Sequence, residues 1–327
     1  MKLFLGLLPS SRPNRTRIFA ESSGKLVDLQ LACAALLSQS PEHRANAYEP
    51  AAFYFPETIA AFLERGEPAR KALNEVVAFV RQSGVGELRG PGGETIAYEA
   101  KEVRLLPPIF NPEKSFVIGF SDRARTEALP QAEIPTGFYK LPQTFVTHGA
   151  PIIWPKFSNE VDADGCLAIV IGKAGKRIAP EKAWEHVAGA TLMIDITARD
   201  INRREGLTTN NLLGKNFLSS TCLGPAVLLG NSRKDFTALE VDLAFDGAVK
   251  QKFALRDCVF TVEQIIARWS ILGIKPGDWL AIGASMARQG ERLQNSVPLK
   301  IGATICCSSP LIGELSHPIV SAGGLGR

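Results

Sequence analysis

The composition of this 327-residue chain is that of an ordinary globular protein, with 45% hydrophobic and 21% charged residues. Its formal charge of +4 is spread along the sequence without a basic block interleaved with aromatic residues, which argues against a nucleic-acid-binding surface. No apolar run approaches the roughly 20 residues of a membrane span, and the apolar start Met1–Leu8 is too short for a signal peptide. We therefore expect a cytoplasmic protein without a nucleic-acid or membrane partner, and its mildly basic charge is compatible with small acidic substrates.

The cysteines show neither a CxxC pair nor the spacing of a secreted disulfide scaffold. Buried, reduced thiols are the expected state of all six, which are Cys33, Cys166, Cys222, Cys258, Cys306 and Cys307.

The first hundred residues predict a small unit of strands and helices. Short apolar runs alternate with turns from Lys2 to Val27, and helical periodicity follows from Leu29 to Leu37. Two more helices are expected over Pro56–Arg65 and Ala69–Gln82, then a strand over Ala97–Leu105. The prolines that follow mark a linker, so we predict an N-terminal α/β domain over residues 1–108 and a second domain over residues 109–327.

The second domain is predicted to be rich in strands. Helical spacing occurs over Pro180–Gly189 and over Val262–Leu272. Sparse helices among many strands favour an α+β fold over a doubly wound parallel sheet. The predicted strands are Ser115–Gly119, Gly137–Tyr139, Cys166–Gly172, Ala190–Asp195, Leu239–Phe245, Trp279–Gly283 and Ala303–Cys307.

Several motifs recur in a fixed order through the second domain. Asp164 begins a strand-like run that ends in Val-Ile-Gly-Lys, and Asp195 begins the run Asp-Ile-Thr-Ala-Arg-Asp. Further matches are Phe138-Tyr139-Lys140, Thr147-His148-Gly149, Gly214-Lys215-x-Phe217, Leu223-Gly224-Pro225 and Pro276-Gly277-Asp278. From about Lys114 to Val320 the chain thereby resembles the fumarylacetoacetate hydrolase family. The resemblance implies a mixed β-roll core, preceded here by the small N-terminal domain, and a homodimer.

The resemblance also implies a divalent Mg²⁺ or Mn²⁺ ion held by three carboxylates, which would polarise a 2-oxo acid or β-diketone. The matching positions are Asp164, Cys166 and Asp195. Because a thiol is a soft ligand, Cys166 favours Zn²⁺ or another transition metal and weakens a Mg²⁺ site even if Glu160 or Asp162, on the same face, replaces it. A site without metal is the other alternative. Turn capping at a strand end is the structural alternative for the two aspartates.

Many members of the family activate water with a His and Glu pair in a loop after the first core glycine. Here Arg125 stands at the His position and Ala128 at the Glu position. Glu127, one position away, is a candidate catalytic residue that could still reach into the site, because loop register is soft. An arginine stays protonated and cannot act as a general base, so hydrolysis is disfavoured.

Other positions of the family's site are changed or kept. The substrate-contacting Thr corresponds to Ala284, with Ser285 beside it, and a Gln corresponds to Asn202. Lys140 and Lys215 are kept, and each could neutralise a substrate carboxylate or stabilise an enolate.

Three further residues receive explicit predictions. His148, which follows the Lys140 strand, is a candidate catalytic residue whose alternative role is structural. Cys166 is a candidate nucleophile if neighbouring lysines lower its pKa, and otherwise a buried core thiol. We also expect Arg199 to pair with Asp200 and brace the Asp195 loop.

Three functions follow from these observations. The first is an enzyme that cleaves, decarboxylates or tautomerises a small 2-oxo or β-dicarbonyl acid. The second is a metal-independent relative that condenses or cyclises a β-keto intermediate in biosynthesis. The third is a non-catalytic binding protein that keeps the fold.

Overall fold

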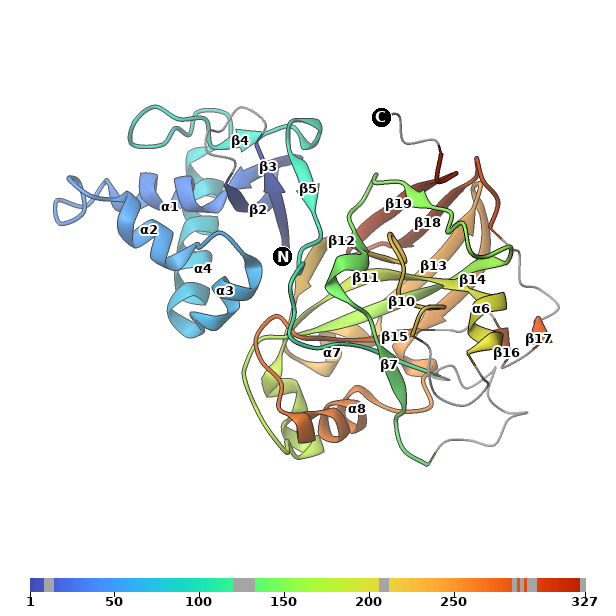
Figure 1. Ribbon diagram of the computed structural model, residues 1–327. Helices are drawn as coiled ribbons and strands as arrows, with labels where there is room; N and C mark the ends of the chain where they lie inside the picture. The colour runs from blue at the N-terminus through green and yellow to red at the C-terminus, as the bar shows by residue number, and fades with distance from the viewer. Residues whose placement is uncertain are drawn as a thin grey trace.

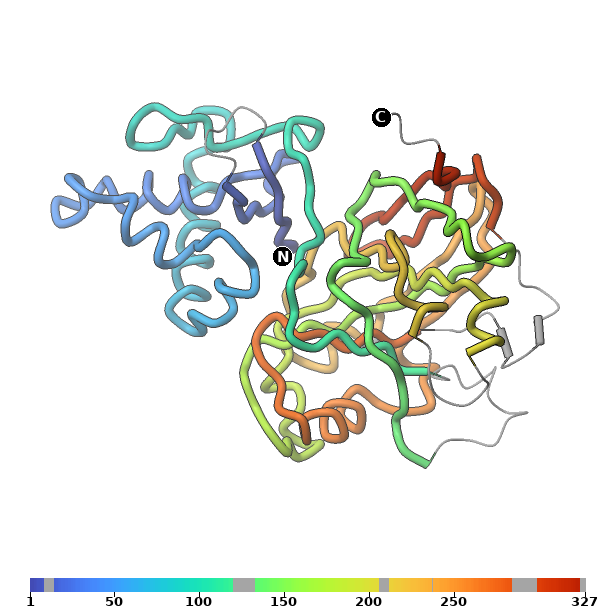
Figure 2. The backbone as a smooth tube through the Cα atoms, in the orientation of Figure 1, coloured from blue at the N-terminus to red at the C-terminus, as the bar shows by residue number. Residues whose placement is uncertain are grey.

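The structure is a computed structural model, and it describes residues 1–8, 15–119, 133–205, 212–283, 287–288, 291–292 and 299–323. A helical N-terminal part lies beside a larger body built mainly of strands (Figure 1). The chain passes from the first part to the second along the segment around residue 108 (Figure 2). The predicted α+β class with a β-rich core is confirmed.

The N-terminal part combines an antiparallel sheet edge with four helices. The strands are β1 (Lys2–Leu7), β2 (Thr16–Ser22), β3 (Lys25–Asp28), β4 (Ala97–Tyr98) and β5 (Arg104–Leu106). The helices are α1 (Leu29–Leu37), α2 (Tyr48–Tyr54), α3 (Ile59–Glu64) and α4 (Glu67–Ser83). The α1 prediction is confirmed, whereas α2 was missed. The strand predicted over Ala97–Leu105 is wrong as one element, because a 3-10 turn at Ala100–Glu102 divides it.

The body contains most of a mixed 12-stranded sheet with the order β4-β3-β2-β1-β12-β11-β10-β15-β6-β7, to which β5 and β8 add at β1 and β12. Its strands in the body are β6 (Ser115–Ile118), β7 (Gly137–Tyr139), β8 (Phe145–Val146), β10 (Val161–Ile171), β11 (Val187–Ala198), β12 (Thr221–Leu229) and β15 (Trp279–Gly283). The sequence analysis missed β12, at which β1 joins the sheet. The boundary at residue 108 stays a prediction, since the sheet continues across it.

A second sheet of five strands has the order β14-β13-β18-β19-β9. Its strands are β9 (Ile152–Ile153), β13 (Glu240–Phe245), β14 (Ala248–Ala254), β18 (Thr304–Ser309) and β19 (Gly313–Val320). Two short strands, β16 (Ala287–Arg288) and β17 (Glu291–Arg292), form a separate pair. The analysis foresaw β13 and β18 and missed the other three strands of this sheet.

Each predicted helix of the body is partly right. Pro180–His186 is a 3-10 helix that ends before β11. The second begins as α8 (Val262–Trp269) and continues as a 3-10 turn over Ser270–Leu272. Thr261 caps α8, because its hydroxyl accepts from the Gln264 amide while the Gln264 side chain accepts from the Thr261 amide. Two short helices complete the body, α6 (Arg199–Arg204) and α7 (Arg233–Thr237). None of the helices in the described part of the chain is long and apolar enough to cross a membrane.

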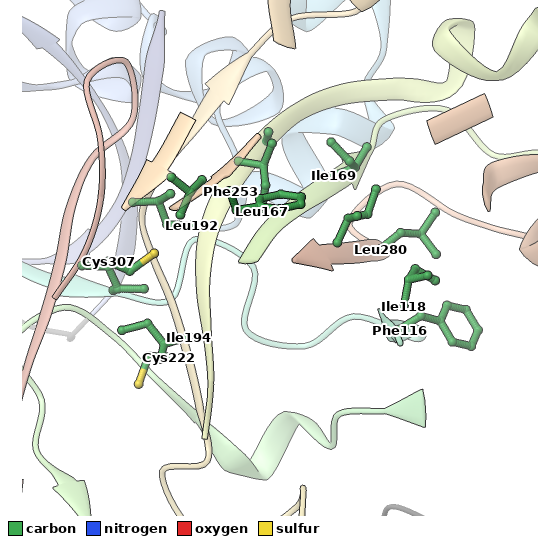
Figure 3. Packing of buried hydrophobic residues seen from close by; sticks show 14 of the residues in the cluster. Phe116, Ile118, Leu167, Ile169, Leu192, Ile194, Cys222, Phe253, Leu280 and Cys307 are labelled. Atoms are coloured by element: carbon green, nitrogen blue, oxygen red, sulfur yellow. The ribbon is translucent and has the colours of Figure 1, made fainter. Parts of the chain in front are cut away.

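The central strands β10 and β11 are buried on both faces, and side-chain alternation assigns each face to a different core. Leu167 and Leu192 point to the core shared with the five-stranded sheet (Figure 3). Cys166 and Met193 point to the opposite face and belong to the core that includes the N-terminal helices. Asp164 and Asp195 follow the same alternation and share the face of Cys166. All six cysteines are free thiols, as predicted, and five are buried.

Asp28 begins α1 and is completely buried, so its charge is held in an apolar environment. Its Oδ1 accepts from the Leu31 amide at 3.0 Å, and Arg17 lies 3.6 Å from Oδ2. Burial raises the pKa of Asp28 to about 6, despite the Leu31 bond and Arg17.

We predict that Asp28→Asn stabilises the protein at neutral pH. The folded-state pKa of about 6 lies above the unfolded value of 3.8, so the free energy of unfolding falls as the pH rises from about 4 to about 6 and then stays low. The asparagine keeps the cap and cannot ionise. We expect a gain of about 3 kcal/mol at pH 8 that disappears near pH 4, measured by chemical unfolding. Asp28→Ala, which removes the cap, is the control and should not stabilise; equal stability of Asp28→Asn and wild type at pH 8 would contradict the prediction.

Candidate active site

Two aspartates face each other across the central strands. Asp164 on β10 is the register partner of Asp195 on β11, and both are buried. Directly opposed like charges destabilise a sheet, and burial removes the water that would screen them. The pair therefore requires cations.

Two lysines bind both carboxylate oxygens of Asp195. Lys140 Nζ lies 2.8 Å from Oδ1, and Lys215 Nζ lies 2.6 Å from Oδ2. Burial would raise the pKa of Asp195, but the two ammonium groups outweigh burial and lower it. Asp195 is therefore a buried carboxylate with its charge compensated on both sides.

Lys140 directly follows β7, and its side chain has no solvent exposure. Besides Asp195, its ammonium group donates to the carbonyl oxygens of Lys215 and Ser220, the latter at 3.1 Å. Burial lowers the pKa of Lys140 despite the neighbouring Asp195. Lys140 thus connects Asp195 to the turn that carries Lys215.

Asn216 lies in the same turn and binds the backbone on either side of Lys140. Its Oδ1 accepts from the Leu141 amide at 2.7 Å, and its Nδ2 donates to the Tyr139 carbonyl at 3.0 Å. The chain on both sides of Lys140 is therefore bonded to the turn, which fixes the position of Lys215.

Lys215 lies between the two aspartates. Its Nζ donates to Thr197 Oγ1 at 2.6 Å, is 3.9 Å from Asp164 Oδ2, and sits 4.9 Å from the centre of the Phe138 ring. Its side chain is 6% exposed, against 0% for Lys140. Of the two lysines, Lys215 is the one that can meet a ligand.

Arg199, at the start of α6, compensates the remaining acids. Its Nε donates to both oxygens of Asp162 at 2.7 and 2.8 Å, and its Nη2 donates to Asp164 Oδ2 at 3.0 Å. Burial alone would lower the pKa of Arg199, but Asp162 and Asp164 outweigh it and raise the pKa. Burial raises the pKa of Asp164 against the opposing effect of Arg199 and Lys215.

The predicted pairing of Arg199 with Asp200 is wrong. Asp200 instead accepts from the Ser158 hydroxyl and the Asn159 amide. The two side chains diverge because the backbone turns from β11 into α6 at this point.

Cys166 shares the face of the aspartates and is packed tightly among apolar neighbours. A Cβ atom added to Gly283 would lie 2.4 Å from its Sγ. The condition set for a nucleophilic Cys166, a pKa lowered by the lysines, is not met. Burial raises the pKa of Cys166 well above its usual value, and Asp195 and Asp164 add to that effect against the opposing effect of Lys215. Cys166 is a protonated core thiol.

The predicted metal ligands Asp164, Asp195 and Cys166 do not fit a divalent ion as they are arranged. Asp195 already binds two ammonium groups, and Cys166 is packed in the apolar core against Gly283. Within the described ranges, no three His, Cys, Asp or Glu side chains come together as an ion would require. The alternative ligands Glu160 and Asp162 are paired with arginines, Glu160 with Arg203 at 2.9 Å and Asp162 with Arg199.

The remaining predicted residues either lie outside this charge network or fall outside the residues that the structure describes. His148 Nδ1 accepts from the Ser316 amide on β19 at 3.1 Å, a structural contact. Asn202 lies in α6, where it contacts the backbone of Gly214. Four other predicted positions fall outside the described residues, namely Arg125, Glu127, Ala284 and Ser285.

The sequence analysis did not identify three of the polar groups that complete the site. Thr197 lies two residues after Asp195 on a strand, so alternation could have revealed it. Asn216 and Ser220 lie between β11 and β12 in sequence and become partners of the Lys140 segment only through the fold.

Comparisons with known proteins agree with this architecture. The family described as fumarylacetoacetate (FAA) hydrolase C-terminal matches residues 117–320. The mitochondrial oxaloacetate tautomerase fahd2 of Xenopus laevis is 31% identical over 283 residues, which cover 84% of this chain and 81% of the relative. The oxaloacetate tautomerase YisK of Bacillus subtilis is 32% identical over 230 residues, covering 68% and 75%.

Solved structures share the fold. The maleylpyruvate hydrolase of Sphingobium sp. SYK-6, in complex with manganese(II) and pyruvate, has a TM-score of 0.69 at 19% identity, covering 98% of this chain and 99% of that one. The fumarylacetoacetate hydrolase of Exiguobacterium antarcticum has a TM-score of 0.69 at 22% identity, with the same coverage. The expected β-roll core is thereby confirmed.

We predict that Lys140→Met lowers the free energy of unfolding by about 3–5 kcal/mol, because one side of the Asp195 carboxylate and two carbonyl groups lose their buried partner. Chemical denaturation measures the loss. Adding Asp195→Asn to Lys140→Met should recover part of it. Lys2→Met is the control, since the partly exposed Lys2–Glu21 pair should contribute at most about 1 kcal/mol. A loss as small as that of the control would show that Lys140 does not hold the site together.

We also predict that Cys166 resists alkylation in the folded protein. Iodoacetamide reacts with thiolates, and burial both raises the pKa of Cys166 and excludes the reagent. Peptide mapping at pH 8 should find the half-buried Cys306 modified first and Cys166 modified only after unfolding. Selective labelling of Cys166 in the native state would instead support a nucleophilic role.

Proposed function

Because the chain belongs to the fumarylacetoacetate hydrolase family, we propose that it is an enzyme that interconverts the keto and enol forms of a small 2-oxo acid. The observation that carries the proposal is the Lys215 ammonium group, held beside Asp164 and Asp195 on a side chain that is 6% exposed, against 0% for Lys140. The relatives named oxaloacetate tautomerase support this reaction class and suggest a dicarboxylic substrate.

The chemistry requires one proton acceptor and one group that stabilises negative charge on oxygen. As the enol forms, a C–H bond beside the carbonyl breaks and its proton passes to a carboxylate. The resulting carboxyl group then gives that proton to the enolate oxygen, which regenerates the carboxylate. We assign oxygen stabilisation to Lys215 and proton transfer to Asp164. Lys140 acts as a positioning residue, since its enclosed ammonium group holds the turn.

Tautomerisation suits this chain better than hydrolysis. Arg125 stands where a family His would activate water, and its guanidinium cannot accept a proton. A proton shift within one substrate needs no attacking water. Decarboxylation and C–C cleavage remain the alternatives for a catalytic site, and product analysis distinguishes them.

Two other functions are distinguished by ligand response. A metal-independent enzyme that condenses or cyclises a β-keto intermediate would join two substrate molecules or two groups of one substrate molecule. A non-catalytic binding protein would show only a thermal shift with β-keto acids. The homodimer and the cytoplasmic location stay predictions, and the vertebrate relatives are named as mitochondrial.

The test follows the decay of freshly dissolved enol-oxaloacetate by its ultraviolet absorbance. We expect the wild-type chain to accelerate ketonisation over the spontaneous rate. Lys215→Ala should lower kcat/KM by about 100-fold, because it removes the charge beside the developing enolate.

Lys173→Ala is the matched control, since this lysine is exposed and pairs only loosely with Glu185 at 3.9 Å. It should retain wild-type activity. Absence of acceleration by the wild-type chain, or equal activity of Lys215→Ala and Lys173→Ala, would refute the proposal.

A further inference from the structure

The charges of the site are balanced without an added ion. Arg199 binds Asp162 through both carboxylate oxygens. The opposed pair Asp164 and Asp195 is matched by Lys140 and Lys215, with contacts from 2.6 to 3.9 Å. Among the described residues of the site, three buried carboxylates thus meet three cations, which leaves no surplus negative charge there to attract a divalent cation.

This match of carboxylates and cations depends on position 166, which holds a thiol where the family resemblance implies a third carboxylate. Position 166 lies on the same strand face as Asp164 and holds a neutral thiol, buried beside Gly283. A thiol is a soft ligand, whereas Mg²⁺ and Mn²⁺ prefer oxygen ligands, so Cys166 is a poor substitute for a third carboxylate.

Lys215 occupies the space between the carboxylates. Its Nζ is 2.6 Å from Asp195 Oδ2 and 3.9 Å from Asp164 Oδ2, so an ion bridging these two atoms would displace the ammonium group. The lysine is held there by Thr197 as well. The residues that would bind a metal are engaged with one another.

We propose that this site binds its substrate without a divalent cation, and that the ammonium group of Lys215 contacts the substrate's oxygen atoms directly. The identity of the substrate as a 2-oxo acid rests on the proposed function, whereas the metal-independence rests on the contacts above. Lys215 would supply, in place of a divalent cation, the positive charge that stabilises the enolate oxygen.

The test is a Mn²⁺ titration of the full chain after treatment with a chelator and its removal, with free Mn²⁺ measured by electron paramagnetic resonance. The variants are Cys166→Glu and the shorter Cys166→Asp, each of which restores a third carboxylate. Cys166→Ser is the matched control, since it is similar in size to wild type and uncharged.

We expect wild type and Cys166→Ser to bind no Mn²⁺ at millimolar concentration. At least one acidic variant should bind it at least about tenfold more tightly than wild type. If neither acidic variant folds, the wild-type titration decides alone. One Mn²⁺ per wild-type chain at micromolar concentration overturns the inference, and so does equal affinity in wild type and a folded acidic variant.

The ketonisation assay on the chelator-treated wild type separates this inference from the proposed function. Activity that appears only with added Mn²⁺ refutes metal-independence and leaves the tautomerase proposal standing. A chain that neither binds Mn²⁺ nor accelerates ketonisation refutes the tautomerase and leaves the metal-free site standing. Activity without Mn²⁺ supports both.

Discussion

The contact of Asp195 with two lysines is the interaction on which the candidate site depends. A buried carboxylate opposite a second carboxylate is unfavourable, and Lys140 and Lys215 make the arrangement possible. Removing one partner would leave a charge buried without full compensation. The same ammonium group of Lys140 holds the backbone of the turn that presents Lys215, so charge compensation and site geometry come from the same contacts.

The position of the site follows from how the central strands are covered. One face of β10 and β11 packs against the five-stranded sheet, and the other joins the core of the N-terminal helices. On that second face the side chains change from apolar to acidic between Cys166 and Asp164. The candidate site therefore begins where the apolar side chains of this face end, and its polar groups are buried.

The chain has the fold of its family. The motif resemblance implies a third carboxylate at position 166, where this chain has Cys166 beside the opposed aspartates and the two lysines. A neutral thiol suits a packed apolar position, as its contact with Gly283 shows. We infer that the retained lysines carry the function that an ion would otherwise share, which fits a proton shift better than activation of water.

The sequence by itself determined the fold class, helix α1, the central strands and the residues Asp164, Asp195, Lys140 and Lys215, because hydrophobic periodicity and ordered motifs are local features. It could not determine which charges meet. Arg199 pairs with Asp162 and Asp164, and Lys140 and Asn216 bond to the turn that carries Lys215. These contacts, and the burial that raises the pKa of Cys166, depend on segments far apart along the chain. Burial and long-range packing set these contacts, so only the tertiary structure decided that the predicted metal ligands and lysines are partners of one another.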